Sequence, residues 1–143
     1  MLRHLSTLIV SLGLSACTTS GSQKPEIDGH QESLRTAIAR LTLQTPEFGS
    51  ISVIKAKIIN ARISAPLEKR EAFSGEAYTS YCIHGAIENP LFPIHQQAYA
   101  EAQIKERGGQ RKIQIHASRL ACGGSGFEPF PEIEELSIAR YRS

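Results

Sequence analysis

Two histidines and one glutamate are the side chains of this sequence best suited to bind a metal ion. His84, Glu101 and His116 fall in three separate stretches with strand character. Imidazole nitrogens and carboxylate oxygens are common zinc ligands, so the three residues would form a site if the strand order brought them together. The spacing does not require this, and a solvent-exposed pair between Glu101 and His116 explains these two residues equally well. We therefore assign no metal site and expect no cofactor.

Ser125 is the candidate nucleophile, because glycines flank it on both sides. A nucleophile elbow follows the pattern G-x-S-x-G, but Phe127 stands at its last position and no helix is expected directly after the serine. The same glycines are not followed by the lysine and hydroxyl residue of a phosphate-binding loop. A serine hydrolase would also need a base within hydrogen-bond reach. We interpret the segment as a flexible loop and expect no catalytic residue.

The mixed charge of the chain argues against binding to nucleic acids. The sequence has 16 Lys and Arg residues and 14 Asp and Glu residues, which gives a formal net charge of +2. These charges are interspersed, whereas a nucleic-acid-binding surface needs a basic patch or stripe. The chain also has no Trp and only 6% aromatic residues, so it offers little for base stacking. Nucleic acid is therefore not an expected partner.

A hairpin turn at Gly108 and Gly109 is the clearest local structure in the sequence. The turn lies between two alternating runs, Gln97–Glu106 and Arg111–Arg119. Glycine accepts the positive φ angles that a two-residue hairpin turn requires. The register then follows, with one apolar and one polar face. The pairs that we expect to face each other are Arg107 and Gln110, Ile104 and Ile113, Ala102 and Ile115, and Glu101 and His116.

Helices are predicted at both ends of the domain, with two further strands between the first helix and the hairpin. Asp28 and Gln31 fit a capping box, and the apolar spacing that follows predicts a helix over residues 29–43. The additional strands are expected at 51–63 and 77–87, and prolines should break the pattern at 89–93. After Pro131, a short helix should begin with an acidic turn and end with Arg140 and Arg142. The glutamates of that first turn are Glu132, Glu134 and Glu135.

These elements predict an α+β fold in which the N-terminal helix packs on a four-stranded antiparallel meander. The alanines on the apolar face of the hairpin are small, and this suits a helix packed closely against the sheet. A short C-terminal helix and one disulfide complete the expected architecture.

The N-terminal 16 residues predict a removable export signal. Arg3 and His4 are followed by an apolar run that ends at Leu14 and is too short to span a bilayer permanently. The run is followed by Ser15, Ala16 and Cys17. An apolar residue, two small residues and a cysteine in this order resemble the lipobox of bacterial lipoprotein precursors. The alternative, an ordinary secretory signal with a chance cysteine, would leave an odd free thiol in an oxidising compartment.

The resemblance to lipoprotein precursors implies that Cys17 becomes the acylated first residue of the mature chain. Several acyl chains anchor a protein lastingly, whereas one chain gives only marginal binding. Thr18 stands where an aspartate signals retention at the inner membrane in enteric bacteria, so the outer membrane is favoured. The expected organisation is a signal peptide at 1–16, a flexible tether at 17–27 that carries Cys17, and a single α+β domain at 28–143.

Cys82 and Cys122 are the two cysteines that remain once Cys17 is assigned to lipid. In an exported domain they are most simply one disulfide bond. A catalytic thiol pair would need a closer spacing such as C-x-x-C, which these two residues lack.

Apolar residues near prolines form the candidate surface for a partner. They are Leu91, Phe92, Phe127 and Phe130. Burial at the edge of the core is the favoured explanation for them, and a partner surface is the second. A semi-rigid apolar surface would suit another envelope protein. The first hypothesis is therefore a non-enzymatic, membrane-anchored envelope lipoprotein that binds or supports another envelope component. The second is a lipoprotein that binds a small ligand or metal on the polar face of its sheet. The third, with least support, is an envelope hydrolase.

Overall fold

The computed structural model describes residues 32–49, 56–89, 92–118 and 120–143, and at 89 and 92–94 it describes the backbone alone. These residues belong to one compact unit, Gln31–Ser143. The expected leader, the tether with Cys17, the capping box and Leu91 lie outside the described residues. The elements in chain order are α1 (Leu34–Thr42), a short 3-10 helix η1 (Pro46–Phe48), β1 (Lys57–Ile63), β2 (Leu67–Arg70), β3 (Ala77–Asn89), β4 (Phe92–Arg107), β5 (Gln110–Ser118), β6 (Glu128–Pro129) and α2 (Pro131–Arg142).

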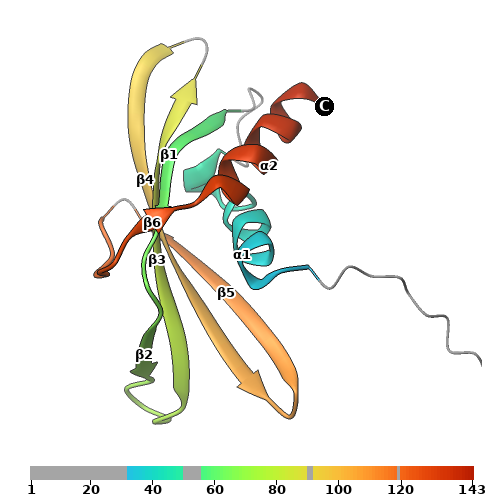
Figure 1. Ribbon diagram of the computed structural model, residues 1–143. Helices are drawn as coiled ribbons and strands as arrows, with labels where there is room; N and C mark the ends of the chain where they lie inside the picture. The colour runs from blue at the N-terminus through green and yellow to red at the C-terminus, as the bar shows by residue number, and fades with distance from the viewer. Residues whose placement is uncertain (1–31, 50–55, 90–91, 119) are drawn as a thin grey trace, which may run out of the picture. The chain divides into compact units, whose positions relative to one another are not determined.

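The sheet is antiparallel and has six strands in the order β5-β4-β3-β1-β6, with β2 paired to β3 outside this path (Figure 1). The predicted α+β class is confirmed, but the count of four strands is wrong, because β2 and β6 were not expected. β3 pairs with β4 along one edge, and its other edge is shared between two strands. Its first residues pair with β2 and its last residues pair with β1.

The β4–β5 hairpin has the predicted turn and register. Gly108 and Gly109 have φ angles of 57° and 76°, and no heavy atom lies within 4 Å of a Cβ built on either. Their role is therefore to supply positive φ and not to relieve crowding. The expected pairs are all present: Arg107 with Gln110, Ile104 with Ile113, Ala102 with Ile115, and Glu101 with His116.

β4 begins earlier than predicted, at Phe92, so the proline segment is shorter than the expected break. Pro93 lies inside the strand, and the ladder with β3 shifts register between Ile87 and Asn89. Pairing of β4 with β5 starts only at Tyr99. Proline is tolerated here because this part of β4 has a hydrogen-bonded strand on one side only.

Helix α1 starts later than predicted. Ser33 is its N-cap, and the Ser33 side chain accepts a hydrogen bond from the backbone N–H of Thr36. A serine directly before an apolar repeat is a better cap than the more distant Asp28, since its oxygen reaches the free N–H groups of the first turn. The predicted start at residue 29 is therefore wrong, while the predicted end at 43 differs from the observed end by one residue.

Small side chains on the inner face of the sheet allow the two helices to pack closely. Ala98, Ala100 and Ala102 of β4 are at most 3% exposed, and they share a core with Ile38 of α1 and Ile133 of α2. Arg35 of α1 joins the helices: its Nε donates to Glu132 at 2.5 Å, it forms an ion pair with Glu128, and it lies over the Phe130 ring. The predicted C-terminal helix, with acidic first turn and basic last turn, is confirmed.

A disulfide between Cys82 and Cys122 is present as predicted, with the two Cα atoms 5.7 Å apart. Residues 120–127, which we call the strap, cross the outer face of the sheet, opposite to the helices (Figure 1). At Gly124 an added Cβ would lie 2.9 Å from the Cβ atoms of Cys82 and Ser64, and Ala65 N–H donates to the carbonyl of Ser125 at 3.0 Å. The strap then continues into β6, which pairs with β1. One layer therefore covers each face in this part of the sheet.

Candidate functional site

The three residues that were considered for metal binding lie on the outer face of the sheet but do not form a site. Glu101 lies opposite His116 in the ladder, and His84 pairs with Tyr99. His84 instead packs against Phe127 of the strap, with ring centroids 4.9 Å apart. Within the part of the chain that the structure describes, no group of three or more His, Cys, Asp or Glu residues could hold a metal ion.

Glu101 is committed to neighbouring side chains. It accepts hydrogen bonds from Lys69 of β2 at 2.8 Å and from Ser80 of β3 at 2.6 Å. Burial alone would raise the pKa of Glu101, but these hydrogen bonds and the charge of Lys69 outweigh it and lower that pKa below its ordinary value. Glu101 is therefore a charged structural anchor between β2, β3 and β4.

The expected apolar partner surface is not formed as predicted. Phe130 is fully buried and belongs to the core, so its assignment to a surface is wrong. It immediately precedes Pro131, and its ring lies beneath the guanidinium of Arg35. Phe127 is half-buried against His84. Leu91 and the side chain of Phe92 lie outside the described residues. These four residues therefore do not define one exposed patch.

Ser125 lies in the strap and belongs to no catalytic arrangement within the part of the chain that the structure describes. Its side chain is exposed, and among the described residues its hydroxyl has no histidine or carboxylate bonded to it. The sequence predicts a flexible loop around Ser125, but Gly124 is held against Cys82 and Ser64. At that position the sequence needs glycine for close approach of two segments.

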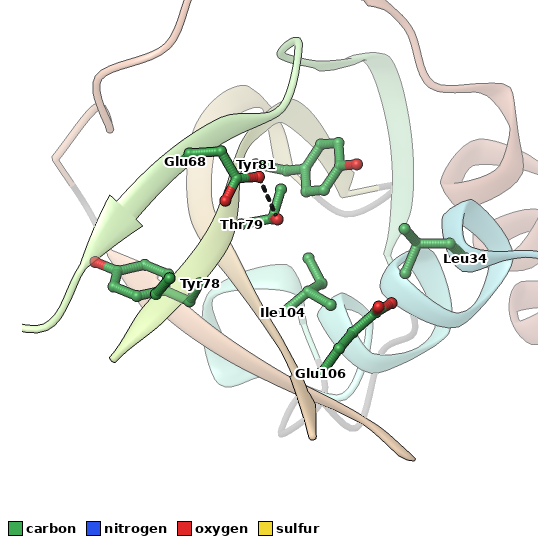
Figure 2. Close-up of a pocket in the computed structure, with 8 residues that line it drawn as sticks. Leu34, Glu68, Tyr78, Thr79, Tyr81, Ile104 and Glu106 are labelled. Atoms are coloured by element: carbon green, nitrogen blue, oxygen red, sulfur yellow. Dashed lines mark hydrogen bonds between the residues drawn. The ribbon is translucent and has the colours of Figure 1, made fainter. Parts of the chain in front are cut away.

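A cavity of about 310 Å³ opens at the other end of the sheet, between the start of α1, the β2–β3 hairpin and β4 (Figure 2). Tyr81 and Ile104 come from the inner face of the sheet, where both strands extend past the helices. The carboxylate of Glu68 points to Thr79, while that of Glu106 lies on the side of Leu34. The lining residues are Leu34, Glu68, Ala77, Tyr78, Thr79, Tyr81, Ile104 and Glu106.

The lining of this cavity combines aromatic rings with negative charge. Glu68 accepts a hydrogen bond from the Thr79 hydroxyl at 2.7 Å, and Glu106 accepts one from Arg111 at 3.0 Å. Glu106 is thereby ion-paired with Arg111, whereas Glu68 has no ion pair with any described residue. No cationic side chain of the described residues lines the cavity. Tyrosine rings and carboxylates in one lining favour a ligand that is cationic and has an apolar body.

Sequence reasoning missed this cavity because it missed β2. Ser74 and Gly75 lie between β2 and β3, and Gly75 has a φ of 69°. A serine–glycine pair between two runs is a turn signal, and it was the available indication of a second hairpin. β2 itself has no alternating pattern, since none of its four residues is buried. Only the fold brings Glu68 across from Glu106.

A second hollow, of about 440 Å³, lies beside Leu43 and Leu136, between the two helices. Arg140 lines it, but its guanidinium donates to the carbonyls of Leu43 at 2.7 Å and Phe48 at 3.2 Å. Burial lowers the pKa of Arg140. Because these donors hold the end of α1 and η1, Arg140 explains the docking of α2. Its buried Nε has no hydrogen-bond partner among the described residues, and Arg40, which also lines the hollow, is ion-paired with Glu32.

Comparison with protein-family models, with curated proteins and with solved structures finds no match for this chain. In the stretches that the structure describes, no helix is both long enough and apolar enough to cross a membrane. A functional conclusion therefore rests on the chemistry of the site itself.

Proposed function

We propose that this chain is a non-enzymatic, lipid-anchored binding module of the bacterial envelope that takes a small cationic ligand in the cavity of Figure 2. The observation that supports it is the lining, in which Tyr78 and Tyr81 lie beside Glu68 and Glu106 without a cationic side chain of the described residues. Glu106 is ion-paired with Arg111 outside the lining, so Glu68 supplies the unpaired negative charge. An ammonium group would bind the carboxylate oxygens, and its apolar body would lie against the rings and Ile104.

The anchor in this proposal is Cys17, in the lipobox Leu14, Ser15, Ala16 and Cys17. The acyl chains on Cys17 would hold the domain at the membrane, with the outer membrane favoured by Thr18. The ligand class replaces the apolar protein-binding surface as the favoured hypothesis, because Phe130 belongs to the core. Another envelope component can still be the partner if it presents the ammonium group.

Three probes of equal chain length test the ligand class: hexylamine, hexanol and hexanoate. Titration calorimetry on the full chain should give heat with hexylamine, little with hexanol and none with hexanoate. Replacing both Glu68 and Glu106 by Gln should remove the preference for the amine, because the negative charge is then absent. Glu135→Gln is the matched control, since Glu135 is exposed on α2, away from the cavity. Equal heats for the three probes would refute the cationic ligand.

The anchor is tested separately in cells by feeding a labelled fatty acid. The unaltered chain should carry the label, and Cys17→Ser should lose it and accumulate at the mass of the precursor. A labelled Cys17→Ser protein would show that the lipobox assignment is wrong. This result is independent of the calorimetry, so either half of the proposal can fail alone.

A further inference from the structure

The two hairpin turns at the end of the sheet present a fully exposed aromatic ring on one turn and exposed basic side chains on the other. Phe73, in the turn between β2 and β3, is 105% exposed, the largest value among the exposed apolar residues of the described chain. Arg107 and Lys112, at the β4–β5 turn, are also exposed. Both turns lie at the same end of the molecule, at the bottom of Figure 1.

The turn that carries Phe73 is ordered by its own hydrogen bonds. Gly75 N–H donates to the carbonyl of Glu71 at 3.0 Å, and Glu71 N–H donates to that of Glu76 at 2.9 Å. Arg70 adds a bond to the carbonyl of Gly75 at 3.2 Å. The hydrogen-bonded backbone thus holds the phenyl ring out into solvent. Burial of the ring in an apolar phase would remove aromatic surface from water without further loss of backbone conformational entropy.

Ion pairs join this turn to the basic hairpin. Lys105 of β4 binds Glu71 and also Glu76, the latter at 3.2 Å. A hollow of about 470 Å³ lies between the hairpins, and it is lined by four cationic side chains and one carboxylate. Its lining is Glu76, Lys105, Arg107, Gln110, Arg111 and Lys112.

The cations of this hollow divide into paired and unpaired groups. Lys105 is paired with Glu71 and Glu76, and Arg111 is paired with Glu106 at 3.0 Å. Arg107 and Lys112 have no ion pair or side-chain hydrogen bond with any described residue. Their charge is therefore available to an anion, and phosphate is the anion that a guanidinium beside an ammonium suits best.

We propose that the two turns form a membrane-contact surface, in which Phe73 enters the headgroup region of an anionic phospholipid bilayer while Arg107 and Lys112 bind lipid phosphates. An aromatic residue at the interface and basic residues at the headgroups are the two contributions that hold a peripheral protein on such a surface. The contact does not depend on lipidation of Cys17, and it goes beyond the ligand cavity because none of the three residues lines that cavity.

A single tryptophan tests the contact, because the chain has none of its own. Phe73→Trp in the full chain should shift its emission to shorter wavelength on phosphatidylglycerol vesicles, and lipids with nitroxide-labelled acyl chains should quench it. Phosphatidylcholine vesicles should leave it unchanged. Leu120→Trp is the matched control, since Leu120 is 78% exposed but lies on the strap. Its emission should stay that of a solvated indole on both vesicles.

The charge contribution is tested in the Phe73→Trp chain by adding Arg107→Gln or Lys112→Gln. Each change should weaken binding to phosphatidylglycerol by roughly fivefold. The emission and the binding are both measured with Cys17 present and with Cys17→Ser. Loss of the lipid anchor and loss of the membrane-contact surface are then seen separately. An unshifted emission from the Phe73→Trp chain, an equal response on both lipids, or equal quenching at positions 73 and 120 would overturn the proposal. Circular dichroism shows that each variant is folded.

Discussion

The two ends of the sheet are built in opposite ways. At the strapped end, α1 and α2 cover one face, residues 120–127 cross the other, and the disulfide joins the layers. At the hairpin end, the β2–β3 and β4–β5 turns extend past the helices and are connected mainly by ion pairs of Lys105. Stability is concentrated where layers are closed, and the surfaces that we propose for binding lie where the strands continue without cover.

The difference is visible in how far the apolar side chains of the inner face are exposed. Ile83 and Ala100, which pair across β3 and β4 at the strapped end, are at most 1% exposed. Ile113, on the same face at the hairpin end, is only half-buried. The inner face of the sheet therefore passes from a packed core on the central strands to a partly exposed surface on β5, the edge strand.

Removal of the disulfide should have the largest effect on this contrast. Replacing Cys82 and Cys122 together by Ala should destabilise the domain by on the order of 4 kcal/mol, because the bond closes a loop with a sequence separation of 40. Urea unfolding followed by circular dichroism measures the loss. Leu120→Ala, an exposed change in the strap, should have little effect. A double variant as stable as the unaltered chain would show that the strap is held by packing alone.

A core truncation at each end compares the two regions directly. Ile83→Ala should cost about 3 kcal/mol, because it opens a cavity at a fully buried position. Ile113→Ala should cost less than half as much, since part of that side chain already faces solvent. The free energies of unfolding of the two variants give the comparison. Equal losses would mean that the hairpin end is as closely packed as the strapped end.

The glycine turn offers a smaller and cleaner test. Gly109→Val should destabilise the chain by about 1–2 kcal/mol, because a residue with a Cβ resists the left-handed backbone found there. Gly123→Val is the control: no atom lies within 4 Å of the added Cβ at either position, but Gly123 has no positive φ. Thermal unfolding of both variants separates backbone strain from crowding, and similar melting temperatures would contradict the assigned turn.

The smallest effect concerns pH. Burial, and then the charge of Arg62, lowers the pKa of His84 beneath the strap. The unfolded chain therefore takes up a proton at higher pH than the folded one, so this contribution to stability is present above about pH 6.5 and is lost as the pH falls through the folded-state pKa. Stability measured from pH 7 downward should fall less steeply in His84→Gln than in the unaltered chain or in His116→Gln. An unchanged slope in His84→Gln would exclude His84 as the source of this pH dependence of stability.

Local signals in the sequence predicted those parts of the fold that depend on neighbours in the chain. Gly108 and Gly109 with their alternating flanks defined a hairpin and its register, and Pro131 with glutamates after it defined the start of α2. The cysteine pair followed from elimination. Each of these features can be recognised within a short window or from residue type alone.

Features held by distant contacts were not predictable in this way. β2 exists because Lys69 and its neighbours pair with β3, although four mostly exposed residues show no period. β6 is two residues long and depends on the strap. The cavity forms only because Glu68 and Glu106, which are distant in the sequence, line the same hollow. The burial of Phe130 is also not predictable locally, because Arg35, which lies over its ring, comes from the opposite end of the domain sequence.

The bond between Cys82 and Cys122 also makes the middle of the chain a covalent ring that contains the β4–β5 turn. A protease that cuts after the exposed Arg107 opens this ring once, and the two fragments stay one molecule until the disulfide is reduced. A cut after Arg70, outside the ring, separates the chain covalently at once. The exposed basic turn can therefore be nicked while the protein keeps its covalent continuity, which the β2–β3 hairpin cannot offer.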